Sequence, residues 1–372
     1  MKILVLLGTR PEVIKMAPVI HALREAGVET LLCSTGQHRE MLQQALDVFA
    51  LVPDLSLEVM SSGQSLNALS SKLLLALDQV MESLRPDWVL VQGDTTTAFC
   101  GALAAFHRGI KIAHVEAGLR TGDLNSPFPE EANRSLLARI AHLHFAPTQR
   151  AREALLREGI DAKQICVVGN TVVDAILIAK QLPGFREKRA ASISAHEGPL
   201  ILVTCHRREN FGGVLEGICQ SLRRLCERYP EYHWVFPVHL NPQVQEPVHR
   251  ILQGLKNLSL LEPLDYLSNL ALISRAVLLV TDSGGLQEEA PSFGVPVVVM
   301  RNHTERFEGV EAGLATLAGQ DPKDIEKAII AWLENPSAGE ALKKKANPYG
   351  DGFASKRIAQ KLCGQAMEEF HG

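Results

Sequence analysis

The sequence lacks several features that would point to particular protein classes. It has no apolar run close to the roughly 20 residues needed to span a bilayer, so we expect no membrane association. A formal net charge of -4 argues against a strongly cationic nucleic-acid-binding protein. The 7 cysteines include no CxxC pair, which argues against a zinc site and a disulfide framework. We therefore expect buried, reduced thiols in a cytoplasmic protein.

Common cofactor and catalytic motifs are also absent. There is no GxGxxG for a dinucleotide, no GxxxxGK[ST] for a nucleoside triphosphate, no HExxH for a zinc protease and no GxSxG for an α/β-hydrolase. These absences remove the usual support for redox, P-loop and metal-dependent chemistry. The sequence thus predicts an enzyme that works without a bound cofactor or metal.

What is present is a globular chain of 372 residues, 46% hydrophobic and 22% charged, which is long enough for about two domains of roughly 150 residues. Short apolar runs alternate with amphipathic stretches, and this pattern occurs twice. Because most runs are continuously apolar, they suit parallel strands buried on both faces. The expected strands are 3–7, 30–34, 88–92, 111–115, 144–146 and 165–168, then 200–204, 233–237, 259–261, 277–281 and 297–300.

Repeated strand–helix units predict an α/β fold with two Rossmann-like, doubly wound domains that face each other across a cleft. We expect a first domain over 1–180 and a second over 199–353. The polar, Pro- and Gly-containing segment 181–198 is interpreted as the linker. A final helix over 354–370, in the segment 354–372, is expected to pack back on the first domain. Ligands of such sheets bind beyond the carboxyl ends of the strands, so we expect functional residues at those positions.

In the first half, the first strand leads into the turn 8–12, GTRPE, and a helix. This turn is expected to direct amide donors toward an anion, assisted by Arg10 and Lys15, unless these are only solvated basic groups. Asp94 follows the third strand. It could cap the next helix, but the neighbouring threonines can also do so, which would leave Asp94 available for chemistry.

Two further acids follow the next strand. Glu116 comes directly after an apolar run, and Glu130 with Glu131 begins a helix, where one of the pair could simply complement the helix dipole. Three loops thus bring carboxylates toward one cleft. Crowded carboxylates repel each other, which would raise a pKa and make one of them a usable proton donor.

The second half carries basic and glycine-rich strand ends. His206 follows a strand beside Arg207 and could donate a proton or contact a phosphate. The turn Ser283-Gly284-Gly285 at a helix start suits a pyrophosphate. Glu289, one turn later, suits ribose hydroxyls, and Arg306 could clamp a phosphate. These features favour a cleft enzyme for a nucleoside-diphosphate compound.

The motifs taken in order are more specific than this class. GTRPEVIKMAP, TGQHREML, VQGDTTT, HVEAGLRTGD, SPFPEEANR, GNTVVDA, HRREN, PVHLNP, TDSGGLQEEAP and NPYGDG extend from Lys2 to about Asp351. In this set the sequence resembles the non-hydrolysing UDP-N-acetylglucosamine 2-epimerases. The resemblance implies a glycosyltransferase-B-like fold, a homodimer, and interconversion of UDP-GlcNAc and UDP-ManNAc that supplies ManNAc for surface polysaccharide.

The resemblance also implies a mechanism and residue roles. UDP is eliminated to leave 2-acetamidoglucal, and it then adds back with the proton delivered to the other face of C2. Matching positions make Asp94, Glu116 and Glu130 the acid/base group and place His206 near the diphosphate. Which carboxylate serves which face stays open. The positions that match nucleotide contacts are Arg10, Lys15, Ser283, Gly284, Gly285, Glu289 and Arg306.

Members of this family often bind a second UDP-GlcNAc as activator, and the matching positions are Gln37, His38, Lys72, Arg207 and His239. Lys72 replaces a common Arg there, which removes the bidentate fork. Other departures are Asn269 in place of an aromatic, Phe307 in place of Pro, and Leu314 in place of Thr. Alternatives that share many features are a hydrolysing 2-epimerase, which releases ManNAc and UDP, and a UDP-sugar glycosyltransferase.

Overall fold

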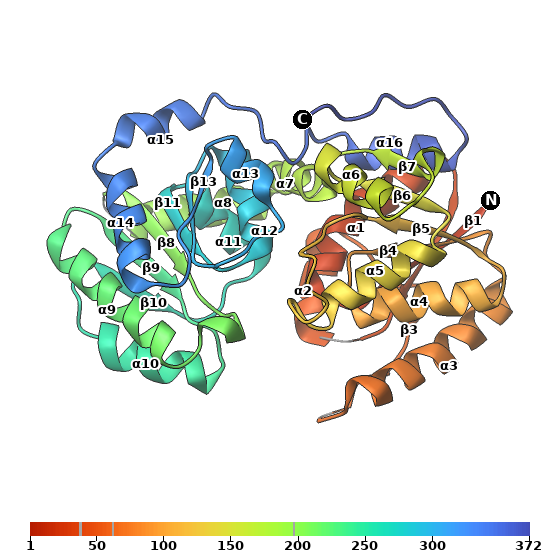
Figure 1. The fold of residues 1–372 in the computed structure, drawn as a ribbon, viewed down its shortest axis with the longest axis horizontal. Coiled ribbons are helices and arrows are strands. Elements are labelled where there is room, and N and C mark those ends of the chain that lie inside the picture. Colours follow the sequence, from red (N-terminus) through yellow and green to blue (C-terminus); the bar gives the residue numbers. More distant parts are fainter. Residues whose placement is uncertain (37–38, 62, 196–197) are drawn as a thin grey trace. The chain divides into compact units, whose positions relative to one another are not determined.

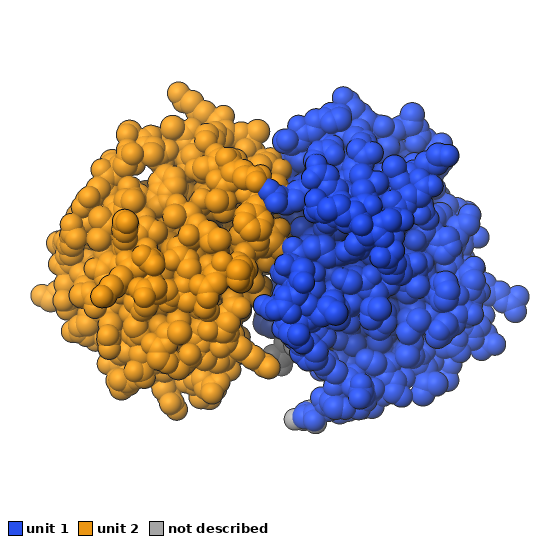
Figure 2. All heavy atoms as spheres, viewed as in Figure 1, with its two compact units in different colours: residues 1–178, 349–372 blue, residues 179–348 orange. Residues whose placement is uncertain are grey.

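The computed structural model describes residues 1–36, 39–61, 63–195 and 198–372. The chain forms two compact units, coloured separately in Figure 2. The first unit comprises Met1–Ile178 and Tyr349–Gly372, and the second comprises Ala179–Pro348. The first boundary falls within helix α7, Thr171–Gln181. Each unit is described here by itself.

The first unit contains a seven-stranded sheet of order β3-β2-β1-β4-β5-β6-β7, in which all pairs are parallel (Figure 1). Its strands are β1 Lys2–Leu7, β2 Glu29–Ser34, β3 Leu55–Ser56, β4 Trp88–Gln92, β5 Lys111–Val115, β6 Leu143–Ala146 and β7 Ile165–Val167. Its helices, besides the start of α7, are α1 Arg10–Glu25, α2 Arg39–Val48, α3 Leu66–Leu84, α4 Thr96–His107, α5 Glu130–Ile140, α6 Gln149–Arg157 and α16 Ala354–Leu362.

The second unit contains a six-stranded parallel sheet of order β10-β9-β8-β11-β12-β13. Its strands are β8 Leu200–Thr204, β9 His233–Pro237, β10 Leu258–Leu261, β11 Ala276–Thr281, β12 Val297–Val299 and β13 Ala315–Leu317. Its helices are α8 Pro183–Ala195, α9 Gly213–Arg228, α10 Pro242–Leu252, α11 Tyr266–Ile273, α12 Gly284–Glu289, α13 Phe307–Glu311, α14 Pro322–Leu333 and α15 Pro336–Leu342.

The central strands follow directly from the apolar runs. In β1, Ile3 to Leu6 are all 0% exposed, as expected for a strand covered by helices on both faces. All eleven strands expected from the sequence are present, and the α/β class with two doubly wound sheets is confirmed. The strands β3 and β13 were not expected, because two or three residues are too short to show a pattern.

The segment expected as a linker is instead largely helical and belongs to the second unit. Helix α8 occupies 183–195 and packs on α11, where Lys188 donates to the Asp265 carboxylate at 2.8 Å. Phe185 is buried and lies with its ring centroid 6.4 Å from that of Phe293. The helix is fixed by a single buried aromatic residue among polar ones. One apolar side chain produces no hydrophobic periodicity, so the helix could not be identified from the sequence.

The last helix is shorter than expected. It ends at Leu362, and Gly364 adopts a φ of 70°, a left-handed conformation that terminates helices. Beyond it the chain is extended, and the buried Phe370 donates its N–H to Val167 O of β7 at 2.9 Å. The segment 354–372 thus packs within the first unit.

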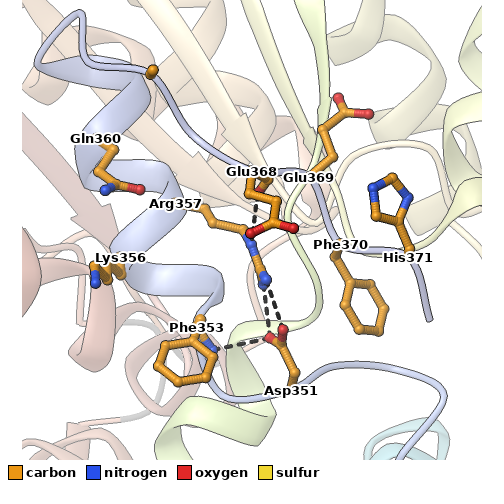
Figure 3. Close-up of a pocket in the computed structure, with 10 residues that line it drawn as sticks. Asp351, Phe353, Lys356, Arg357, Gln360, Glu368, Glu369, Phe370 and His371 are labelled. Carbon is orange, nitrogen blue, oxygen red and sulfur yellow. Dashed lines mark hydrogen bonds and ion pairs between the residues drawn. The ribbon is translucent and has the colours of Figure 1, made fainter.

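Arg357 of α16 holds this C-terminal segment in place. Its guanidinium pairs with Asp351 at 2.7 and 2.6 Å and donates to Glu368 O at 2.9 Å (Figure 3). These groups line an open surface hollow of about 550 Å³. None of the residues that line it is a candidate site residue, so the hollow does not extend the predicted site.

Within the described residues, no helix combines the length and the apolarity that crossing a membrane requires. All seven cysteines are free thiols, and six of them are buried. Burial raises the pKa of Cys33, Cys219 and Cys226 to about 12, so these thiols stay protonated at neutral pH.

Candidate functional site

Two candidate acids leave the sheet of the first unit at neighbouring strand ends. Gln92 at the end of β4 pairs with Val115 at the end of β5, and Asp94 and Glu116 follow within two residues. Glu116 has a φ of 63°, a left-handed conformation that is unfavourable for a residue with a Cβ. Such conformations concentrate at functional sites, because the surrounding structure must enforce them.

Glu116 is held by three side chains. Lys15 Nζ and Asn170 Nδ2 contact Oε1, the latter at 3.1 Å, and Gln92 Nε2 donates to Oε2. The Lys15 and Glu116 side chains are each only 8% exposed. Lys15 was expected to meet a nucleotide phosphate, but in this structure its charge compensates the buried Glu116 carboxylate.

Asp94 is held by two consecutive residues of α5. Arg134 Nη2 lies 2.9 Å from Asp94 Oδ2, and Asn133 Nδ2 donates to the Asp94 main-chain carbonyl at 2.9 Å. Thr95 caps α4 by accepting the Ala98 N–H at 3.0 Å, as the sequence analysis anticipated. Asp94 is therefore not used as a helix cap.

Asp94 and Glu116 do not crowd each other in the way that the sequence predicts. Asp94 faces Arg134, whereas Glu116 faces Lys15, so each carboxylate has a cation of its own. An opposite charge within about 4 Å favours the ionised form of a carboxylate. The arrangement thus supplies two separately compensated acids.

The structure distinguishes the neighbouring acids at the start of α5. Glu131 is 2% exposed and accepts the backbone N–H groups of Thr121 and Gly122, each at 3.1 Å. Glu131 thereby anchors the loop that precedes the helix. Glu130 in the first turn of α5 is only half-buried and is the member of the pair that remains a candidate for chemistry.

The glycine turn before α1 binds an anion that belongs to the chain itself. Glu12 Oε2 accepts the N–H groups of Gly8 and Thr9 at 2.9 and 2.7 Å. Its other oxygen accepts the Thr95 hydroxyl at 2.7 Å, and burial raises the Glu12 pKa despite these hydrogen bonds. The expectation that these amides face an external anion is therefore wrong, because Glu12 occupies them.

A pair of buried histidines lies beneath the Asp94 turn. His114 of β5 and His144 of β6 are paired in register and are both 0% exposed. His114 Nε2 is 2.7 Å from Gly93 O, so this nitrogen carries the proton and donates to the turn. Burial lowers the pKa of His114 to about 3 and that of His144 to about 4, with a further contribution from nearby cationic groups.

These histidines predict acid sensitivity of the fold. A folded-state pKa below the usual histidine value of 6.5 means that the unfolded chain binds more protons, so stability falls as pH decreases below about 6.5. Between pH 7 and pH 5, each of the two histidines should lower the free energy of unfolding by about 2 kcal/mol. In urea unfolding, His144→Gln should reduce this pH-dependent loss by about that amount, whereas His107→Gln, at an exposed site, should not. Equal slopes for all three proteins would contradict the prediction.

In the second unit, His206 faces a buried carboxylate. His206 Nδ1 lies 3.1 Å from Asp282 Oδ1, and the other Asp282 oxygen accepts the N–H groups of His206 and Arg207 at 2.9 and 2.8 Å. Burial would raise the Asp282 pKa, but the contacts with His206 and these amides lower it to about 2. The ionised Asp282 therefore fixes the His206 ring, whose side chain is 41% exposed.

The predicted pyrophosphate turn begins α12. Ser283 precedes the helix, and a Cβ on Gly285 would meet nothing within 4 Å, whereas one on Gly284 would lie 2.8 Å from the Arg306 guanidinium carbon. Glu289 at the end of α12 is buried. Gly284 therefore allows Arg306 to approach the start of this helix.

Arg306 itself is engaged by carboxylates. Its Nε lies 2.8 Å from Glu288 Oε1, and its Nη1 pairs with Glu305. Glu305 also pairs with Arg301 at 3.2 Å, and all four residues are buried. The sequence predicts Arg306 as a phosphate clamp, but its pattern gives no sign of this network of two arginines and two glutamates.

The predicted activator positions are described only in part. Gln37 and His38 lie outside the described residues. Lys72 is exposed and donates to Ser61 Oγ at 2.6 Å. His239 stacks on His206 with ring centroids 6.1 Å apart, and burial followed by the His206 charge lowers the His239 pKa.

Comparisons with known proteins match this chain over almost its whole length. A family model described as UDP-N-acetylglucosamine 2-epimerase matches residues 21–363. A protein of that name from Yersinia pestis is 47% identical over 370 residues, which cover 97% of this chain and 98% of the relative. The chain belongs to the UDP-N-acetylglucosamine 2-epimerase family.

Solved structures agree with this family assignment. A UDP-GlcNAc 2-epimerase from Neisseria meningitidis, whose crystal structure was solved with bound UDP-GlcNAc, has 42% sequence identity to this chain. The two structures superpose with a TM-score of 0.94, and the match covers 98% of this chain and 100% of the Neisseria chain. A family member from Escherichia coli K12 is 46% identical over 369 residues, covering 97% of this chain and 98% of the relative. The resemblance seen in the motifs and the glycosyltransferase-B-like fold class are thus confirmed.

Several residues that shape this epimerase-family site were not assigned from the sequence, although their motifs were noted. Gln92, Arg134 and Asn170 occur in VQGDTTT, SPFPEEANR and GNTVVDA, and Asp282 begins DSGG. What the motifs did not show is which side chain turns toward which acid. A basic residue one turn after Glu130, a candidate acid on the same helix, was the available signal for Arg134.

Proposed function

We propose that this chain is a non-hydrolysing UDP-N-acetylglucosamine 2-epimerase, which interconverts UDP-GlcNAc and UDP-ManNAc and supplies ManNAc units for surface polysaccharide. The observation that carries the proposal is the pair of separately compensated acids, Asp94 and Glu116, at adjacent strand ends. Inversion at C2 by elimination needs one group to remove the C2 proton and another to return a proton on the opposite face.

The proposed reaction proceeds in two balanced steps. A base removes the C2 proton, the C1–C2 double bond forms, and the C1–O bond breaks so that UDP leaves with the electron pair. UDP then adds back to C1 of 2-acetamidoglucal, while an acid delivers a proton to the other face of C2. The route needs no electron acceptor, in agreement with the expected lack of a redox cofactor.

We assign the acid/base work to Asp94, Glu116 and Glu130 in the first unit. His206, oriented by Asp282, would stabilise the departing diphosphate through a hydrogen bond from its ring. The other proposed nucleotide contacts are Arg10, Lys15, Ser283, Gly284, Gly285, Glu289 and Arg306. Lys15 pairs with Glu116 in this structure. To bind a phosphate as well, Lys15 would have to contact the Glu116 carboxylate and the phosphate at the same time.

Solvent exchange at C2 tests this proposal. With UDP-GlcNAc in deuterated water, both epimers should gain deuterium at C2, since the returning proton comes from a group that exchanges with solvent. Proton NMR of the sugar measures this directly. A product mixture that retains hydrogen at C2 would be inconsistent with elimination. Stoichiometric accumulation of UDP with free ManNAc would instead identify the hydrolysing reaction.

Two further features are proposed with this activity. A homodimer is proposed from family membership. An activator UDP-GlcNAc would use Gln37, His38, Lys72, Arg207 and His239. The exposed Lys72 keeps a positive charge but lacks the bidentate fork of Arg, so we expect weak activation.

A further inference from the structure

Helix α5 carries one candidate acid and contacts another through consecutive side chains. We propose that Asn133 and Arg134 are positioning residues that fix Asp94 relative to Glu130, so that the two carboxyl groups keep the spacing that proton transfer at C2 requires. The inference rests on the proposed function and adds to it two residues outside the acid/base group.

The two contacts constrain different parts of Asp94. Asn133 Nδ2 donates to the main-chain carbonyl at 2.9 Å, which fixes the turn. Arg134 Nη2 lies 2.9 Å from Oδ2, which fixes the side chain. Since Glu130 lies in the first turn of the same helix, movement of Asp94 relative to Glu130 requires one of these contacts to break. A single rigid element thus sets the spacing of two acids.

Arg134 is well placed to fix the Asp94 side chain. Its side chain is 4% exposed, whereas that of Asp94 is 29% exposed. A buried guanidinium needs carboxylates nearby, and Arg134 has Asp94 together with Glu131, whose Oε2 lies 3.4 Å from its Nε. The guanidinium is thus held by two carboxylates, which fixes its orientation toward Asp94.

Other groups around Asp94 do not hold its side chain. Glu116 lies on the β5 side, with Oε2 3.6 Å from the position of a Cβ on Gly93. His114 of β5 contacts the Gly93 carbonyl, and Glu12 of α1 reaches the turn only through Thr95. Arg134 is the cation that contacts the Asp94 carboxylate among the pairs described.

A comparison of two variants at one position tests the contact with the Asp94 side chain. Arg134→Gln should lower kcat about thirtyfold, whereas Arg134→Lys, which keeps a cation that can reach Asp94, should lower it by less than about threefold. KM should stay within about twofold of wild type in both variants, because the contact positions a reacting group and does not bind substrate. A wild-type kcat in Arg134→Gln would overturn the proposal.

The neighbouring residue tests the main-chain contact. Asn133→Leu should lower kcat about tenfold with KM within about twofold of wild type, because the turn that carries Asp94 loses its contact while the pair with Arg134 remains. Arg108→Gln, which removes a comparable pair with Asp78 on α3, should change neither constant. Equal losses of kcat in Arg134→Gln and Arg134→Lys, with a raised KM in both, would reduce Arg134 to a structural role.

Failure of this inference can be distinguished from failure of the proposed function. If wild-type protein does not exchange deuterium at C2, the epimerase proposal itself fails. If wild-type protein exchanges and Arg134→Gln turns over at the same rate, only the present inference fails. If Arg134→Gln does not fold, Arg134→Lys and Asn133→Leu remain: wild-type kcat in both variants would overturn the positioning role.

Discussion

Replacing Asp94 by Asn should reduce turnover by about 10³- to 10⁴-fold, the usual contribution of a positioned general base at its upper range. Asn keeps the shape of the side chain and the main-chain contact with Asn133, but it cannot accept the C2 proton. UDP binding should stay within about twofold of wild type, because UDP lacks the sugar carbon on which Asp94 acts. Initial rates of epimerisation and calorimetric titration with UDP measure the two effects.

The matched control is Asp47→Asn. Asp47 is an exposed carboxylate on α2 that accepts a hydrogen bond from Gln43 at 2.8 Å, so its replacement changes net charge equally without touching the site. Turnover of the Asp94 variant at the wild-type rate would remove Asp94 from the mechanism. A large loss of UDP affinity would show instead that Asp94 is needed for binding.

Replacing Gly284 by Ala should weaken UDP binding by roughly 10- to 100-fold. A Cβ there would lie 2.8 Å from two atoms of the Arg306 guanidinium, closer than real contacts allow, so Arg306 must move. Movement breaks its pairs with Glu288 and Glu305 and withdraws the proposed phosphate contact. Charge-assisted hydrogen bonds of this type contribute about 1.5–3 kcal/mol, which corresponds to the expected range.

Calorimetry with UDP measures this change, and Gly339→Ala provides the control. Gly339 lies in α15 of the same unit, and a Cβ there would meet nothing within 4 Å. A double variant identifies the cause: in an Arg306→Gln background, Gly284→Ala should weaken binding little further. An equal additional loss in that background would mean that Gly284 acts on the nucleotide without Arg306.

Much of the fold could be predicted because the central strands are buried on both faces. Continuous apolar runs such as Ile3 to Leu7 allow no other interpretation in a chain of this composition. The predictions for two helices were wrong, because each helix depends on a single residue. Helix α8 is stabilised by the buried Phe185, and the last helix ends because Gly364 takes a left-handed conformation. Neither produces a periodic pattern.

The strand ends could be predicted from the sequence, but the contacts of the candidate residues could not. Asp94 and Glu116 follow neighbouring strands of one sheet, whose carboxyl ends lie at one edge, and His206 follows a strand of the second sheet. The partners Arg134, Asn170 and Asp282 could not be assigned in the same way. Their orientation depends on register, on the positive φ of Glu116 and on which helix lies next to which turn. These are tertiary properties that spacing along the chain does not encode.

The course of the chain has a consequence for the order of folding. Residues 349–372 belong to the first unit, and Phe370 and Glu369 bond to Val167 on β7, the last strand of its sheet. A ribosome therefore delivers the whole second unit before the first can cover that strand. Until then β7 offers unpaired backbone groups to other chains, as exposed sheet edges do. Synthesis thus passes through an intermediate that domain-by-domain folding would otherwise avoid.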